Sequence, residues 1–154
     1  MKRLFVIMVL ALASVVSSYD CHAQFSKLSF GKYGVSSIRP ESFRAVKGSV
    51  WLDVKNPMEG FTLSEITGMV YKKGQPFITG KADDFYVSSG SSRCNIYGRA
   101  ALCDGVSLWA VLALIAFDPD DYSIDLSVRI TLDSGATRVV SKKNFPVREL
   151  LKLI

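Results

Sequence analysis

Strict alternation of apolar and polar residues over positions 122–132 constrains the fold of this chain more than any other sequence feature. Large apolar side chains occupy every second position, namely Tyr122, Ile124, Leu126, Val128, Ile130 and Leu132. Successive side chains of a strand point to opposite faces of a sheet, so this stretch predicts a strand with one buried face and one solvated face.

The same period of two recurs along the chain from residue 24 onward. Residues 46–55 place Val50, Leu52 and Val54 on one face, and shorter candidate strands span residues 26–39, 63–71, 76–80, 85–88, 93–102 and 136–141. Turn-forming residues separate these runs at 56–57, 73–76, 89–92 and 133–135. Short strands with turns about every ten residues predict an all-β, antiparallel β-sandwich of the immunoglobulin or fibronectin type. No linker interrupts them, so residues 24–154 are expected to form a single domain.

One segment, residues 105–117, departs from the strand pattern. Its leucines follow helical spacing and Pro119 ends the run, which predicts an apolar helical insert. Both sides of this helix are apolar, and such a helix is normally buried or meets a partner or lipid. Trp109 and Leu112 are therefore candidate contacts for an apolar ligand or a partner. A short C-terminal helix is expected over residues 146–154, and its apolar residues are expected to cover the insert; these are Leu150, Leu151 and Ile154.

The N-terminus has the pattern of a secretory signal peptide. Lys2 and Arg3 precede an apolar run over residues 4–16, and small residues follow. We expect cleavage after Ala23, with cleavage after Ser18 as the alternative. The run is shorter than the about 20 residues of a membrane-spanning helix, so no transmembrane helix is expected after its removal. These features predict an exported protein, periplasmic or secreted.

Cys21 raises the alternative of a lipoprotein. Lipid attachment resembles a pattern with small residues directly before the cysteine, whereas Tyr19 and Asp20 precede it here. We therefore expect no lipid anchor.

Residue types argue against catalysis in the mature chain. Removal of residues 1–23 takes away His22, the only histidine, and with it any histidine-dependent catalytic or metal site. Cys94 and Cys103 are too few for a structural zinc site. On one strand they would lie about 30 Å apart and on opposite faces, which favours two thiols over a disulfide.

The charged residues of the chain indicate no metal-binding or nucleic-acid-binding site. The acidic cluster of residues 118–121 lacks the glycine and terminal glutamate of an EF-hand loop, so we interpret it as a turn rather than a calcium site. A net charge of +5 without a dense basic patch argues against nucleic-acid binding. The sequence predicts no catalytic, cofactor-binding or metal-binding residue, and no cofactor; the chain is interpreted as a non-enzyme.

The strand over residues 50–55, closed by Asn56 and Pro57, resembles the late embryogenesis abundant group 2 domain, also called the water-stress and hypersensitive-response domain. The resemblance covers about residues 35–151 and includes Phe61, Leu63, Tyr71, the turn at 73–74, and Phe145-Pro146-Val147 before Leu150-Leu151. It implies a small β-sandwich with no known catalytic centre. Independently of the family, Pro57 cannot donate to a ladder and must end the strand. The Asn56 side chain is expected to bond the backbone of the turn, which is a structural role.

Two functions remain open at this point. The first is an exported, non-catalytic β-sandwich module that binds or stabilises an unidentified protein of the cell envelope. The alternative is a carrier or binder of a lipid or other apolar ligand, suggested by the apolar insert.

Overall fold

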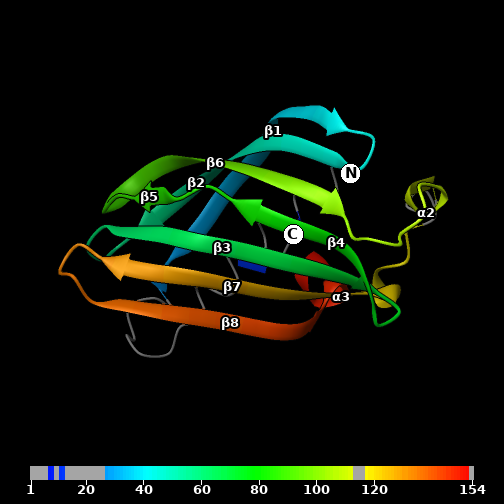
Figure 1. Ribbon diagram of the computed structural model, residues 1–154. Helices are drawn as coiled ribbons and strands as arrows, with labels where there is room; N and C mark the ends of the chain where they lie inside the picture. Colours follow the sequence, from blue (N-terminus) through cyan, green and yellow to red (C-terminus); the bar gives the residue numbers. More distant parts are fainter. Residues whose placement is uncertain (1–6, 9–10, 13–26, 113–116, 153–154) are drawn as a thin grey trace.

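The computed structural model describes residues 7–8, 11–12, 27–112 and 117–152 (Figure 1). The strands are β1 (Ser29–Ser42), β2 (Ala45–Asn56), β3 (Phe61–Lys72), β4 (Gln75–Ala82), β5 (Phe85–Val87), β6 (Gly90–Leu102), β7 (Tyr122–Leu132) and β8 (Thr137–Pro146). Three short helices accompany them: α2 (Trp109–Leu112), the 3-10 helix η3 (Pro119–Asp121) and α3 (Val147–Leu151).

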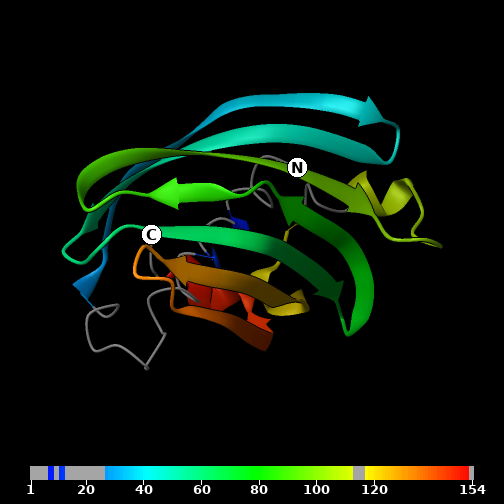
Figure 2. The same cartoon turned by 60° about the vertical axis from the view of Figure 1, so that its left-hand side comes forward.

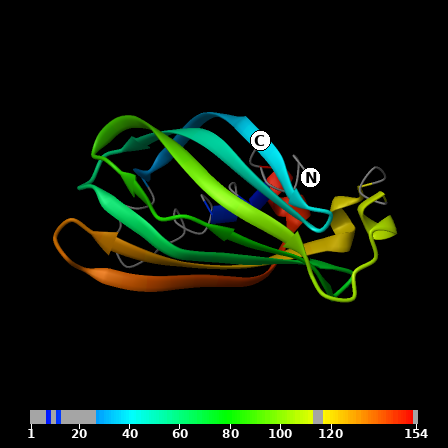
Figure 3. The same ribbon diagram turned by 45° about the horizontal axis from the view of Figure 1, so that its top comes forward.

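All strand pairings are antiparallel, in the order β1-β2-β6-β4-β3-β7-β8, and β5 pairs with β3 beside this path. The sheet folds over, so that the half containing β1, β2 and β6 faces the half containing β3, β7 and β8 (Figures 2 and 3). β4 joins the halves because it pairs with both β6 and β3. The predicted all-β, antiparallel, sandwich-like fold is confirmed, and its two layers belong to one hydrogen-bonded sheet.

Alternation of side chains decides which residues enter the core. Along β7, the five apolar residues from Tyr122 to Ile130 are buried, and the residues between them are partly exposed. β2 buries Val50, Leu52 and Val54 in the same way. The period of two therefore predicted both the strands and the faces that they bury.

α3 fills part of the space between the halves of the sheet. Val147 and Leu150 are fully buried there, and α3 contacts β7, β8 and η3. Because α3 directly follows β8, its apolar side chains enter the concave side of the sheet. The expectation that the tail covers Trp109 is wrong, since Trp109 in α2 remains exposed. The side chain of Leu151 and residue Ile154 lie outside the described part of the chain.

A short N-terminal stretch also lies between the halves. We call Ile7, Met8, Ala11 and Leu12 the inner segment; it is drawn in dark blue beside the red α3 in Figure 3. Ile7, Ala11 and Leu12 are 3%, 1% and 4% exposed. The predicted cleavage sites and Cys21 fall within residues 13–26, outside the described residues. Thus part of the apolar run that predicts a signal peptide shares its core with the sheet.

Within the apolar insert, residues 109–112 are helical as the sequence predicts, whereas residues 105–108 and Phe117 are not. Within residues 105–117, helix is described only for α2, and residues 113–116 lie outside the described part. Gly105 adopts a φ of 80°, the left-handed conformation, so the chain turns before α2 begins. No helix among the described residues is long and apolar enough to cross a membrane.

Candidate binding site

Asn56 anchors the turn that ends β2. Its side-chain amide donates to the carbonyl oxygens of Glu59 at 3.0 Å and Ser88 at 3.2 Å, and its Oδ1 accepts from the backbone N–H of Met58 at 3.0 Å. The residue is 1% exposed. These three bonds satisfy a buried amide and tie the end of β2 to the segment before β6. The Asn56 side chain thus bonds the backbone of the turn, and the strand ends immediately before Pro57.

An apolar surface lies at the opposite end of β2. We call Phe43, Leu108 and Trp109 the apolar end; they are 95%, 48% and 78% exposed. Phe43 belongs to the β1–β2 turn, and the three ribbon views agree in placing α2 beside that turn (Figures 1 to 3). Large exposed apolar side chains that gather on one surface are typical of interaction sites.

Hydrogen bonds hold the two parts of the apolar end together. The Arg44 guanidinium donates to the Cys103 carbonyl at 2.7 Å, and the Leu102 N–H donates to the Arg44 carbonyl at 2.8 Å. The Cys103 N–H donates to the Phe77 carbonyl at 3.0 Å. Behind them, Val106 and Ala110 pack partly against the core. The loop that leads into α2 is therefore fixed to the β1–β2 turn.

Of the two predicted contact residues, the structure places one side chain. Trp109 begins α2 and faces solvent, whereas Leu112 ends α2 and its side chain lies outside the described part. Phe43 was not predicted from the sequence. Phe43 is exposed because it lies in the tight turn between β1 and β2. The signal in the sequence was an apolar residue between Ser42 and Arg44 in a hairpin turn.

In the part of the chain that the structure describes, the cysteines Cys94 and Cys103 are free thiols. Cys94 is buried on β6, and Cys103 is half-buried beyond the end of that strand. The Cys103 Sγ lies 3.5 Å from the Met69 Sδ, and the Cys94 Sγ lies 3.9 Å from the Tyr86 carbonyl. Burial raises the pKa of both thiols. The preference for two thiols over a disulfide is confirmed.

Each aspartate of the 118–121 cluster has a partner within the protein. The Asp118 side chain caps η3 by accepting from the Asp120 N–H at 3.0 Å. Asp120 pairs with Arg148, and Asp121 with Lys73 at 3.6 Å. The cluster is a turn that leads into β7, and the part of the chain that the structure describes contains no group of three metal-ligating side chains.

Ion pairs cover the outer face of the β1–β2–β6 half. Arg93 donates two hydrogen bonds to the Asp53 carboxylate, at 2.7 and 3.1 Å, and lies 3.9 Å above the Trp51 ring. The hydrogen bonds from Arg93 lower the pKa of Asp53. Glu41 pairs with Lys47 and Arg99, which lowers the pKa of its carboxyl.

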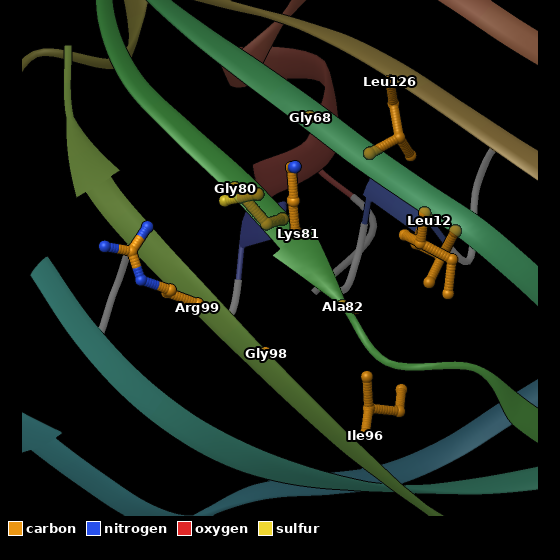
Figure 4. A pocket seen from close by; sticks show the side chains of 11 residues that line it. Leu12, Gly68, Gly80, Lys81, Ala82, Ile96, Gly98, Arg99 and Leu126 are labelled. Carbon is orange, nitrogen blue, oxygen red and sulfur yellow. The ribbon is translucent and has the colours of Figure 1, made fainter. Parts of the chain in front are cut away.

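The inner face has a second candidate site beneath the inner segment. We call the surface formed by Ile66, Gly68, Gly80, Ala82, Ile96, Gly98 and Leu126 the inner groove. Figure 4 shows Leu12 in this region with Ile96 and Leu126. Met8 and Leu12 line the same region, and a cavity of about 30 Å³ remains there.

A repeated sequence pattern underlies the inner groove, and sequence reasoning missed it. β3, β4 and β6 each place an isoleucine, a glycine and a small or branched residue at successive inward positions, namely Ile66-Gly68-Val70, Ile78-Gly80-Ala82 and Ile96-Gly98-Ala100. Gly68 is the register partner of Gly80, and Ala82 is the partner of Gly98. A glycine at the inward position of three neighbouring strands leaves a depression in the sheet, because the strands there lack side chains.

Comparisons with known proteins do not assign a family. No protein-family model matches the sequence, and no match is found among curated proteins. Among solved structures, a protein from Archaeoglobus fulgidus is similar with a TM-score of 0.45 and 11% identity, over 75% of this chain and 94% of that one. A FixG-related protein from Vibrio parahaemolyticus has a TM-score of 0.29 and 13% identity, over 77% of this chain and 94% of that one.

Proposed function

We propose that this protein is an exported, non-catalytic β-sandwich module that binds a protein partner of the cell envelope through its apolar end. The observation that carries the proposal is the exposure of Trp109 in α2 and of Phe43 in the β1–β2 turn, which lies beside α2 and is hydrogen-bonded to the end of β6. Tryptophan is among the residue types that most often dominate binding energy at protein interfaces. The hydrogen bond between Arg44 and Cys103 holds the β1–β2 turn against the loop that leads into α2. Because this surface is already ordered, binding costs less conformational entropy.

The sequence of the first 23 residues supports export. This argument does not depend on the apolar end. The resemblance to the late embryogenesis abundant group 2 domain agrees with a binding role, and we propose membership of that group on this basis. The Asn56-Pro57 pair supports that assignment, because it ends β2 as the resemblance implies.

Site-specific photo-crosslinking in the native cell tests the proposal. A photoreactive amino acid replaces Trp109 in one variant and Phe43 in a second. Tyr97, a 56% exposed aromatic residue on β6, provides the matched control position. We expect a discrete protein adduct at positions 109 and 43, recovered outside the cytoplasm, and none at position 97. Lipid adducts alone, a cytoplasmic adduct, or equal labelling at all three positions would contradict the proposal.

A second candidate function, the binding of a lipid or other apolar ligand, is favoured by the inner groove. Its walls at Ile66, Ile96 and Leu126 are apolar, and its floor carries glycines. A ligand in that position would be enclosed between the halves of the sheet rather than held at the apolar end.

A further inference from the structure

The inner segment contacts the sheet through one face of a helix. Residues 7–8 and 11–12 are helical, and positions four apart lie on the same side of a helix. Ile7, Ala11 and Leu12 are almost completely buried, and Met8 packs against the same core. Two successive turns of an apolar helix thus present four side chains to the concave side of the sheet.

The glycines of the groove floor receive one of these side chains. A Cβ atom built at Gly80 would lie 1.9 Å from the Cε of Met8, and one built at Gly68 would lie 3.0 Å from it. Since Gly68 and Gly80 are register partners, they form one slot across β3 and β4. The Met8 side chain therefore occupies space that exists only because both positions lack a side chain.

Removal of a signal peptide would uncover this surface. Both expected cleavage sites, after residue 18 and after residue 23, follow the inner segment in the chain. Either cut therefore severs all four of its residues from the chain that forms the sheet, so that they are free to dissociate. The floor at Gly68 and Gly80 and the walls at Ile66, Ile96 and Leu126 would then lose their cover, and soluble proteins seldom leave a continuous apolar surface of this kind uncovered.

We propose that the inner groove of the mature protein binds an apolar α-helix of another polypeptide, in the place that the inner segment occupies before cleavage. The partner helix carries an unbranched side chain over Gly68 and Gly80 and further apolar side chains four residues on. A helix with its side chains is about 10 Å across, so it can contact the glycines of the groove floor and the apolar groove walls at the same time. One alkyl chain could fill the Met8 slot but would leave the places of Ile7 and Leu12 empty.

This inference rests on the proposed export, because cleavage opens the groove, but it uses a different surface from the apolar end. Crosslinking at Trp109 tests the apolar end without involving the groove. Peptide binding in the groove can therefore succeed or fail independently of that result.

The experiment uses the full chain with a protease recognition sequence inserted between residues 17 and 24, so that it folds with the inner segment attached. After cleavage, the probe is a dye-labelled peptide of residues 4–16, and fluorescence anisotropy measures its binding. We expect saturable one-to-one binding to the cut protein. Uncut protein should bind at least tenfold more weakly, because its own segment competes at high effective concentration.

Gly80→Val tests the slot, and Gly31→Val is its matched control. Without the inner segment, the nearest atom to a Cβ at Gly80 is the Arg99 carbonyl oxygen at 3.7 Å among the described contacts, so the variant should still fold. At Gly31 on β1, the nearest atom is the Asp53 Cβ at 3.4 Å. We expect Gly80→Val to weaken probe binding at least tenfold and Gly31→Val to leave it within twofold. A probe with Met8→Ala should recover binding to Gly80→Val.

Three outcomes would overturn the inference. The first is unchanged probe binding by Gly80→Val. The second is loss of the β-sheet circular dichroism once the cut segment is displaced, which would show that the inner segment is a required part of the core. The third is displacement of the probe by a sixteen-carbon fatty acid at lower concentration than by unlabelled peptide, which would identify an alkyl-chain site.

Discussion

Replacing Asn56 with alanine should destabilise the protein strongly, because one side chain makes three hydrogen bonds at a buried position. Substitution removes the two bonds to the Glu59 and Ser88 carbonyls and the bond from the Met58 N–H. Each bond contributes about 1 kcal/mol net, and a buried group left without a partner costs about 1–3 kcal/mol. Allowing for water at the part-buried carbonyls, we expect a loss of about 3–5 kcal/mol in the free energy of unfolding.

Thermal denaturation followed by circular dichroism measures this loss. For a domain of roughly 130 residues, 1 kcal/mol corresponds to about 3–4 °C, so Asn56→Ala should lower Tm by roughly 9–20 °C. Asn95→Ala is the matched control, because Asn95 lies exposed on β6 and should change stability by no more than about 0.5 kcal/mol. A Tm for Asn56→Ala within about 2 °C of the wild type would refute the reasoning.

Three further predictions concern charges, thiols and the exposed tryptophan. Hydrogen bonds lower the folded-state pKa values of Glu41 and Asp53, so their stabilisation is complete above about pH 4.5 and is lost as the pH falls. Glu41→Gln combined with Asp53→Asn should therefore flatten the acid limb of a plot of Tm against pH; an unchanged limb would contradict this. Peptide mapping after alkylation should show faster labelling of the half-buried Cys103 than of the buried Cys94, whereas a peptide linking the two through a disulfide would contradict the structure. Trp109→Ser should change the free energy of unfolding by no more than about 0.5 kcal/mol, since the side chain is exposed; a larger loss would show that Trp109 is packed in solution.

Local sequence pattern predicted most of the strands because alternation is a property of the strand itself. The run of residues 122–132 coincides with β7, and the run of residues 46–55 lies within β2. The role of Asn56 could also be predicted from its immediate sequence neighbours. The following proline has no N–H for a ladder, so the strand must end, and a buried amide beside the turn finds backbone partners nearby.

The candidate sites depended on contacts between distant segments, which local pattern does not encode. Trp109 was recognised as an unusual apolar residue, but the place of α2 beside the β1–β2 turn depends on the hydrogen bonds between Arg44 and the end of β6. The glycines at 68 and 80 were visible in the sequence. Their meaning required the strand register, which makes them neighbours across β3 and β4.

The sequence by itself determined which side chains must be buried and which segments alternate between the two faces of a sheet. Only the tertiary structure decided what they are buried against: Leu150 packs within the folded sheet, and Ile7, Ala11 and Leu12 share the same core. The physical reason is that the hydrophobic effect is non-directional and favours any burial of apolar surface. Chain connectivity and strand pairing select the partner, and here α3 follows β8 into the concave side while the loop after β6 carries Trp109 outward.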